Sequence, residues 1–239
     1  MANHSFNLIW HAFQQPKNGH TAEEYEDACA GDPERGRFAV ADGASESAFA
    51  GSWARILVKA YVKVPGSWSA WLPAARKRWR TQVEGKHLPW YAETKFQEGA
   101  QATLLGVAFA EGVWHAQAVG DCCLFQVRGN DLRRAFPVFR SRDFTNQPTL
   151  LGSRPRGTTQ LKSKRLHLKA DWQPKDALYL MTDALAQWFL RKFEDRGKPW
   201  QELQDMPSNE AFGRWVDKQR QAGQMRNDDV TLVRIESKQ

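Results

Sequence analysis

The hydrophobic pattern of the chain changes its period several times, and these changes predict the order of strands and helices. Before residue 99 the pattern predicts strands at 6–13, 26–30 and 37–42. It predicts helices at 47–62, 68–83 and 90–98. Three strands are therefore expected before the first helix. Pro65-Gly66 ends the apolar spacing of that helix, as a breaker pair should.

After residue 99 the pattern becomes typical of β-structure again. The apolar segments ATLLGVAFA, VWHAQAVG, CLFQVRG and LRRAFPVF are separated by short turn sequences, which is the spacing of an antiparallel meander. The composition of residues 140–162, rich in Arg, Ser, Thr, Pro and Gly, predicts a long surface loop. Strands are then expected in RLHLKA, DALYLMTD and DVTLVRIE, and helices in ALAQWFLRKF and 208–222.

This order predicts an α+β fold, a central β-sandwich of two antiparallel sheets with helices outside. The 239 residues contain no internal repeat, and we expect one domain over 1–239. Hydrophobic residues make up 41% and charged residues 26%, values typical of a protein with a sizeable core.

The net charge of +7 indicates attraction to phosphate-bearing or acidic partners. Basic residues cluster at 76–80 and 162–165, and a solvated face explains each cluster better than a nucleic-acid site, since no nucleic-acid motif accompanies them. Three cysteines without a CxxC pair indicate a reducing compartment. No signal peptide or 18-residue apolar run is found, so we expect a cytoplasmic protein without a membrane segment.

Acidic residues recur where predicted strands begin or end: Asp27, Asp42, Asp121, Asp183 and Asp228. Each alone is explained by a turn or a helix cap. Five carboxylates gathered at one end of a sandwich would instead raise one another's pKa unless a cation lay between them. Hard oxygen ligands suit Mg²⁺ or Mn²⁺ rather than zinc. The sequence thus favours a divalent-metal site, provided that these strand ends meet.

Five segments, in order, resemble a known family: RFAVADGASES, GAQATLLGVAF, AQAVGDCCLFQVRG, LYLMTDALAQW and NDDVTLVRI. They are similar to the signature segments of metal-dependent Ser/Thr protein phosphatases of type 2C, the PPM class, in a divergent bacterial-type branch. The resemblance spans about residues 24–235. It implies a β-sandwich flanked by helices with a two-metal site at one end, in agreement with the element order above.

The resemblance also implies roles for individual residues. Asp42 would bridge two Mn²⁺ or Mg²⁺ ions, and the Gly43 carbonyl would bind one of them. Asp183 and Asp228 would hold the other ion, so the expected catalytic residues are Asp42, Asp183 and Asp228. Asp27 would bind through water.

Asp121, together with Asp183, would hold a weaker third ion. The expected reaction is direct hydrolysis of phosphoserine and phosphothreonine in a protein substrate, by water activated between two metal ions. A cognate Ser/Thr kinase is an expected partner, and the chain is expected to act as a monomer without nucleic acid or membrane.

Departures from the family pattern leave an alternative open. Ala22 replaces an arginine that grips the substrate phosphate, a role that Lys17 or His20 could take, and Ala44 replaces a proposed acid histidine. Gln101 and Ala184 are further departures that remove no ligand. The alternative is a weak or inactive relative that binds phosphoproteins or regulates a kinase. A third reading, nucleic-acid binding, rests on net charge alone.

The predicted loop at 140–162 corresponds to the family's flap beside the active site. Its arginines Arg140, Arg142, Arg154 and Arg156 are candidates for contact with a phosphorylated protein, and a plain solvated loop explains them equally well.

Overall fold

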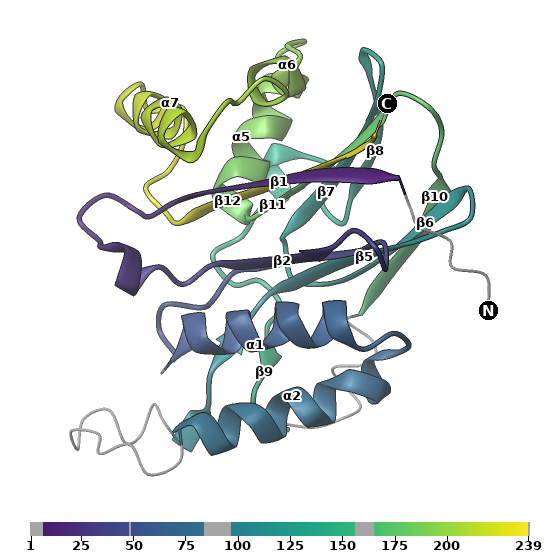
Figure 1. Cartoon of the computed structure of the whole chain (residues 1–239). Coiled ribbons are helices and arrows are strands. Elements are labelled where there is room, and N and C mark those ends of the chain that lie inside the picture. Colours follow the sequence, from purple (N-terminus) through teal and green to yellow (C-terminus); the bar gives the residue numbers. More distant parts are fainter. Residues whose placement is uncertain (1–6, 48, 84–96, 156–164, 239) are drawn as a thin grey trace.

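Two five-stranded antiparallel sheets stacked face to face form the centre of the molecule, which confirms the predicted α+β sandwich (Figure 1). The computed structural model describes residues 7–47, 49–83, 97–155 and 165–238. Three strands precede the first α-helix, as predicted.

The first sheet has the strand order β1-β12-β11-β7-β8. Its strands are β1 (Leu8–Gln15), β12 (Val230–Ser237), β11 (Asp176–Met181), β7 (Cys123–Arg128) and β8 (Asp131–Phe136). The first and last strands of the chain are thus neighbours, with Leu8 paired to Ser237 and Gln15 to Val230. β8 ends at Phe136, shorter than the segment LRRAFPVF predicts, because Pro137 has no amide hydrogen for the ladder.

The second sheet has the strand order β10-β6-β5-β3-β2. Its strands are β10 (Leu166–Asp171), β6 (Val113–Val119), β5 (Leu104–Ala110), β3 (Arg37–Ala41) and β2 (Ala28–Asp32). β3 is buried along its whole length, as its unbroken apolar run predicts for a strand covered on both faces.

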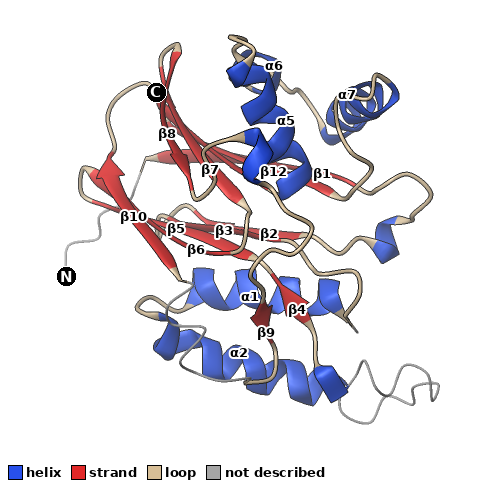
Figure 2. Cartoon of the chain, turned by 180° about the vertical axis from the view of Figure 1, so that it is seen from behind, coloured by secondary structure: helices blue, strands red, loops and turns tan. Residues whose placement is uncertain are grey.

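Helices cover the outer faces of both sheets (Figure 2). On the side of the second sheet lie α1 (Ala50–Lys63), which packs on β2 and β3, and α2 (Trp68–Val83), which packs on α1. On the side of the first sheet lie α5 (Asp183–Glu194), α6 (Pro199–Leu203) and α7 (Asn209–Gln221).

Apolar side chains fill the spaces between these layers in three clusters. One lies between the two sheets, one under α5, α6 and α7, and one under α1 and α2. The last contains Trp53, Trp71 and Trp79, each at most 1% exposed, so the tryptophans of this region are core residues. The Trp53 indole also donates a hydrogen bond of 2.7 Å to the Leu151 carbonyl.

Some elements differ from the sequence prediction. The segment 140–162 contains a 3₁₀ turn, η2 (Ser141–Asp143), and a strand β9 (Leu151–Gly152) that pairs with β4 (Gln101–Ala102). The short helix α6 and the 3₁₀ turn η1 (Ala22–Glu24) were not predicted. Most of the helix expected at 90–98 lies outside the described residues. In the described ranges, none of the helices has the length and apolar character needed to cross a membrane.

Candidate active site

A cavity of about 590 Å³ opens at the end of the sandwich where β3 ends and β12 begins. Three of the predicted aspartates line it, and so does one arginine. These four residues are Asp42, Asp183, Asp228 and Arg226. Side chains from positions 42, 183 and 228, far apart in the chain, therefore face one space.

Asp42 follows the last residue of β3 and is fixed there by its backbone. Its amide donates a 3.2 Å hydrogen bond to the Thr103 hydroxyl oxygen, and its carbonyl accepts a 2.8 Å hydrogen bond from the Thr103 amide. Gly43 comes next, and a Cβ there would lie 2.8 Å from the Ala50 carbonyl carbon and the Glu26 carbonyl oxygen. Only glycine fits between α1 and the chain before β2, so the strand end cannot shift away from the cavity.

Asp183 is the first residue of α5, with Thr182 as the N-cap. The Thr182 hydroxyl accepts a 2.9 Å hydrogen bond from the Thr231 amide, which ties the start of α5 to β12. Asp228 precedes β12 in the neighbouring loop, and the buried Arg220 donates a 2.5 Å hydrogen bond to its carbonyl. The two carboxylates thus come from adjacent strand ends of one sheet.

Asp229, next to Asp228, has a different task. Its two carboxylate oxygens accept hydrogen bonds of 2.8 Å from the backbone amides of Lys17 and Glu26. It is 4% exposed. Asp229 therefore holds the segment before β2 in place, and its oxygens are already used.

Arg226 supplies the positive charge of the cavity, and the sequence analysis did not predict it. Its Nη2 forms ion pairs with Asp183 Oδ2 and, at 3.4 Å, with Asp228 Oδ2. Its Nε is buried and has no hydrogen-bond partner. The only local signal for it was its place two residues before Asp228, in the loop that enters β12.

Asp27 and Asp121 lie deeper, at 2% and 6% exposure. Asp27 Oδ2 accepts a 2.9 Å hydrogen bond from the Thr231 hydroxyl, whereas Oδ1 has no partner. Both oxygens of Asp121 are buried and have no hydrogen-bond partner among the residues that the structure describes. Gly120 precedes it with a φ of +94°, a conformation that favours glycine and directs the turn to this position.

Burial and mutual repulsion raise the pKa values of these carboxyls. Burial raises the pKa of Asp42 to about 7, and the charges of Asp228 and Asp121 add to the shift. Burial raises the pKa of Asp121 to about 6. Burial and the charge of Asp42 hold the pKa of Asp27 well above its usual range. The charge of the Arg226 guanidinium lowers the pKa of both Asp42 and Asp121, so it partly offsets the effect of burial on these two carboxyls.

The five predicted aspartates thus lie in one neighbourhood, although the structure does not arrange them as a finished metal centre. Within the described ranges, no three His, Cys, Asp or Glu side chains are placed to hold an ion together. The Arg226 guanidinium contacts Asp183 and Asp228 from the cavity side, where an ion shared by these two carboxylates would have to bind. The roles of these aspartates and of Gly43 as ligands remain predictions.

The predicted flap contributes to the cavity through other residues than its arginines. The cavity is lined by Thr145, Asn146, Gln147, Pro148 and Leu150, together with Ser45 and Ser47. Arg140 and Arg142 are exposed and do not line it, and Arg156 lies outside the described residues. Sequence alone missed the polar stretch 145–147 because nothing in its composition distinguishes it from an ordinary loop.

The departures from the family pattern have local consequences. Ala22 lies in η1, and Ala44 lines the cavity without a titratable group. Of the two predicted substitutes for an arginine at 22, Lys17 lies beside the cavity. Its ammonium lies 3.4 Å from the hydroxyl of Ser45, a cavity residue, and 3.6 Å from Glu26. His20 is exposed.

A family comparison was decisive for the identity of the chain. The family model described as protein phosphatase 2C matches residues 16–229, most of the sequence. The chain belongs to the protein phosphatase 2C family. The prediction of this family from the sequence is thereby confirmed, and so is the enzyme class, because members of the family are metal-dependent Ser/Thr phosphatases. The family uses Mn²⁺ or Mg²⁺, as predicted.

Solved structures agree with this fold. The Mycobacterium tuberculosis serine/threonine phosphatase PstP/Ppp has a TM-score of 0.64 and 16% identity, over 97% of this chain and 99% of that chain. The PstP catalytic domain in complex with 2 manganese ions has a TM-score of 0.62 and 17% identity, over 96% and 97%. PppA, a regulatory component of the T6SS in Pseudomonas aeruginosa, has a TM-score of 0.61 and 16% identity, over 96% and 97%. No curated protein matches this phosphatase 2C sequence.

Proposed function

We propose that this phosphatase 2C hydrolyses phosphoserine or phosphothreonine in a protein substrate, with two Mn²⁺ or Mg²⁺ ions held at the cavity. Asp42, with the Gly43 carbonyl, and the pair Asp183 and Asp228 would hold these ions. Asp27 and Asp121 would support them from the deeper layer, where a weaker third ion would bind near Asp121. The observation that carries the proposal is the convergence of Asp42, Asp183 and Asp228, from separate strand ends, on one cavity, with Asp27 and Asp121 close enough to Asp42 to interact with its charge.

The chemistry of these residues fits divalent ions. Asp121 has two buried carboxylate oxygens without a partner, and Asp27 has one. A buried carboxylate without hydrogen bonds or a cation is strongly unfavourable, and oxygen-rich sets of this kind suit Mg²⁺ and Mn²⁺. With all five aspartates ionised, as metal binding would require, Arg226 would offset only one of the five negative charges. The remaining negative charge is what two divalent ions would neutralise.

Bound divalent ions lower the pKa of a coordinated water and offset negative charge on phosphoryl oxygens. The chain's own residues orient the reactants. Arg226 lines the cavity. If bound ions released it from Asp183 and Asp228, its guanidinium would be free to bind phosphoryl oxygens in the role of the arginine that Ala22 replaces. The polar side chains of Asn146 and Gln147 offer hydrogen bonds to the peptide that carries the phosphate.

Hydrolysis of a phosphothreonine peptide tests this proposal. We expect release of phosphate with Mn²⁺, none with EDTA, and a loss of about 100-fold or more in kcat for Asp183→Asn, because the variant loses a charge that positions the ion. Asp131→Asn on β8 is a matched control, since it removes an exposed carboxylate that does not line the cavity. Hydrolysis that persists at wild-type rate in Asp183→Asn would contradict the proposal.

A second candidate is a non-catalytic relative that binds a phosphorylated partner or regulates a kinase. The ion pairs of Arg226 with Asp183 and Asp228 favour it, because a permanent arginine there would exclude an ion shared by the two carboxylates. The same assay separates the two functions. Tight binding of a phosphopeptide without turnover in Mn²⁺ would favour the second.

The partners follow from the proposed reaction. A phosphorylated protein would be the substrate, and a Ser/Thr kinase that makes this phosphoprotein would act opposite to the phosphatase. We propose a monomer in the cytoplasm, in keeping with three free cysteines and the absence of a disulfide among the described residues.

A further inference from the structure

The two helices outside the second sheet carry a charge that the proposed reaction does not use. α1 contains Arg55, Lys59 and Lys63, and α2 contains Arg76, Lys77, Arg78 and Arg80. Neither helix contains an Asp or a Glu. The positive charge of these two helices is as large as the net charge of +7 of the whole chain, because the remaining basic and acidic residues are equal in number. The positive excess of the protein is therefore located in this one layer.

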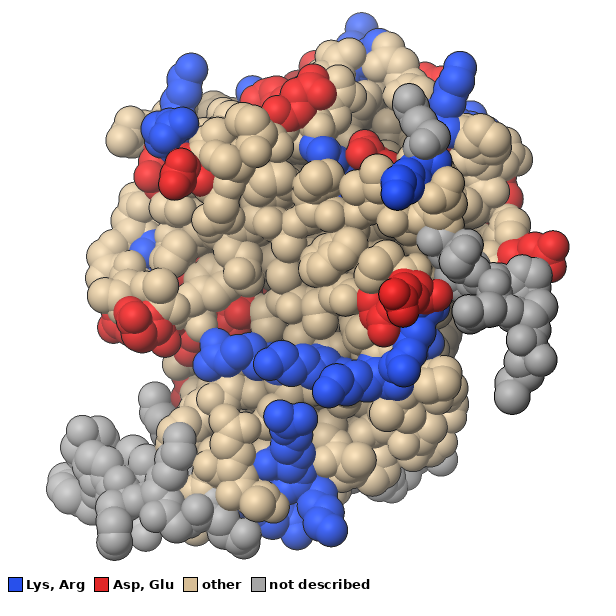
Figure 3. Space-filling view, in the orientation of Figure 1, with Lys and Arg blue, Asp and Glu red and all other residues tan. Residues whose placement is uncertain are grey.

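On α1 the charges form a continuous exposed line. Arg55, Lys59 and Lys63 are all exposed and follow one another at intervals of four residues, which places them on one face of the helix. They extend over about 12 Å at the helical rise of about 1.5 Å per residue. Figure 3 shows a band of Lys and Arg side chains along this helix, with a further group over α2 below it.

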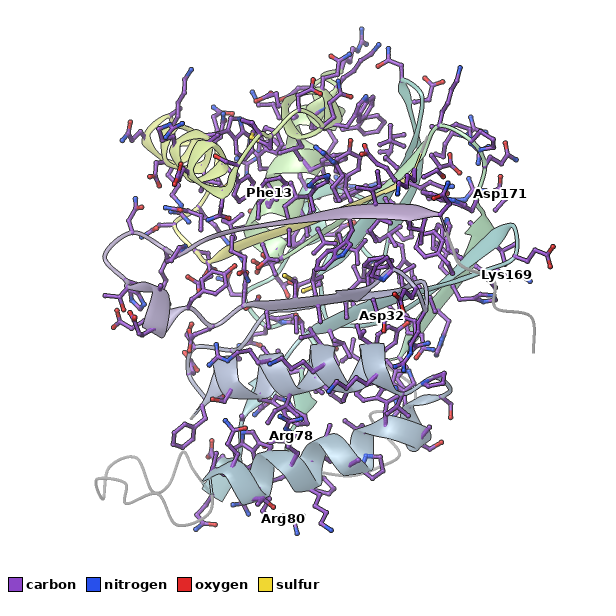
Figure 4. All side chains as sticks on the ribbon, in the orientation of Figure 1. Phe13, Asp32, Arg78, Arg80, Lys169 and Asp171 are labelled. Atoms are coloured by element: carbon purple, nitrogen blue, oxygen red, sulfur yellow. The ribbon has the colours of Figure 1, made fainter. Side chains whose placement is uncertain are left out.

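The line extends beyond both helices. Arg35 donates a 3.3 Å hydrogen bond to the Lys63 carbonyl, so its exposed side chain continues the line past the end of α1. Arg78 of α2 is also exposed and lies on the side facing α1 (Figure 4). We name Arg35, Arg55, Lys59, Lys63 and Arg78 the basic face.

The basic face is not neutralised by the protein itself. Arg35 of the basic face forms an ion pair with Asp32 at 3.6 Å. The other four residues of the face form no ion pair with any residue that the structure describes. Like charges four residues apart weaken a helix, so stability does not explain the arrangement. Such a surface attracts an acidic partner and accelerates its association.

The basic face begins next to the candidate active site. The Arg55 guanidinium donates a 3.3 Å hydrogen bond to the Tyr25 carbonyl, two residues before Asp27. The start of α1 contacts Gly43, where a Cβ would lie 2.8 Å from the Ala50 carbonyl carbon. From there the line runs away from the cavity along α1. A chain with its phosphorylated residue in the cavity would therefore reach this face with its flanking residues.

We propose that the basic face docks an acidic segment of the phosphoprotein substrate, about four extended residues long, since extended chain covers about 3.3 Å per residue. This inference rests on the proposed function of the cavity. A membrane fits the face less well. Among the described residues of α1 and α2, no large apolar side chain is exposed, whereas helices that lie on membranes expose several.

Binding and turnover of two phosphothreonine peptides test the proposal. The acidic peptide is made in two forms, with acidic residues before or after the phosphothreonine. In the other peptide, glutamines take the place of these acidic residues. Fluorescence anisotropy should show that wild type binds the acidic peptide about tenfold more tightly at low salt, and that high salt removes this preference. The variant Arg55→Gln/Lys59→Gln/Lys63→Gln should lose the preference.

A matched control keeps the result specific. Lys169→Gln/Arg214→Gln/Lys218→Gln removes the same charge from exposed positions on β10 and α7, and it should keep the preference. Hydrolysis of p-nitrophenyl phosphate, which is too small to reach Lys59 and Lys63, should be equal in wild type, in the matched control and in Lys59→Gln/Lys63→Gln, which keeps the Arg55 hydrogen bond to Tyr25. If wild type did not hydrolyse p-nitrophenyl phosphate, the proposed function would be overturned. Fluorescence anisotropy would still decide the docking proposal, because it measures binding without turnover.

Equal affinity of wild type and the α1 variant for the acidic peptide would overturn the docking proposal. It would also be overturned if the α1 substitutions left peptide binding unchanged but removed binding to vesicles of phosphatidylcholine and phosphatidylserine, or to duplex DNA. Those results would assign the face to a membrane or to nucleic acid.

Discussion

At the scale of single residues, the candidate site of this phosphatase 2C consists of carboxylates that folding brings together and in part removes from water. Asp42 and Asp121 have raised pKa values because of burial and their neighbours' charges. A carboxyl whose pKa is raised by folding stabilises the folded state fully below its unfolded pKa. That stabilisation is lost as pH rises through the folded pKa. For Asp42 this window runs from about 3.9, the reference value for Asp, to about 7.

The pH dependence of stability should therefore change when Asp42 is neutralised. In EDTA, the wild-type free energy of unfolding should fall between pH 5 and pH 7 by an amount on the order of 1 kcal/mol per pH unit. Asp42→Asn should flatten this slope, because its amide does not titrate. Urea titrations at several pH values measure the free energy of unfolding of both proteins. Parallel slopes for the two proteins would show that Asp42 is already ionised at low pH.

Arg226 should compete with the divalent ions. Its guanidinium contacts Asp183 and Asp228, so an ion that binds both must displace it. Arg226→Gln should bind Mn²⁺ about tenfold more tightly, a change of about 1.4 kcal/mol. Isothermal titration calorimetry without substrate measures this, with Arg214→Gln on α7 as a control for the lost charge. Weaker Mn²⁺ binding by Arg226→Gln would mean that the arginine supports the ion site.

At the scale of elements, strand ends and helix starts decide where the functional side chains lie. α1 packs against the second sheet, where Tyr61, 1% exposed, covers Gly106 of β5. A Cβ at Gly106 would lie 2.6 Å from both Tyr61 Cε1 and Cε2. This contact keeps α1, and with it the Gly43 turn, close to the sheet.

Gly106→Ala should therefore destabilise the fold by about 1–3 kcal/mol, as overpacking of a filled core does. The double variant Gly106→Ala/Tyr61→Leu should cost less than the sum of the two single changes, because the smaller side chain leaves room for the methyl group. Chemical denaturation of the four proteins gives the coupling. Strict additivity would rule out the Gly106–Tyr61 contact as the cause.

Local sequence predicted much of this scaffold. The unbroken apolar run of β3 and the helical spacing from Trp53 to Tyr61 are properties of neighbouring residues, so periodicity found both elements. The pairing of β4 with β9 joins residues 101 and 152 and could not be read from either segment. α6, five residues long and started by Pro199, is too short to show a period.

The positions of three aspartates at the candidate site could be predicted from local sequence, whereas their roles as ligands remain predictions. Asp42, Asp183 and Asp228 stand at the ends of apolar segments, and this local position brought them to one end of the sandwich. Arg226 was missed because its role depends on where a flexible side chain points from a loop, which no spacing encodes. The basic residues of α1 were visible in the sequence, but their exposure and their nearness to the cavity required the fold.

At the scale of the whole molecule, metal binding should couple to stability. An ion that binds the folded state at about 100 times its dissociation constant adds about 2.7 kcal/mol to the free energy of unfolding. For a chain of this size the melting temperature should then rise by about 5–10 °C in Mn²⁺. EDTA should reverse the rise, and Asp183→Asn should reduce it. A melting temperature that does not change when Mn²⁺ is added would contradict binding of the ion at the cavity.

Anomalous diffraction from crystals grown with Mn²⁺ tests the central claim most directly, because it locates the ions without reference to activity. The account predicts two strong manganese peaks at the cavity, within coordination distance of Asp42, Asp183 and Asp228, with Arg226 turned away from Asp183. Manganese bound elsewhere, or a cavity in which Arg226 still pairs with Asp183 and no peak is found, would contradict it.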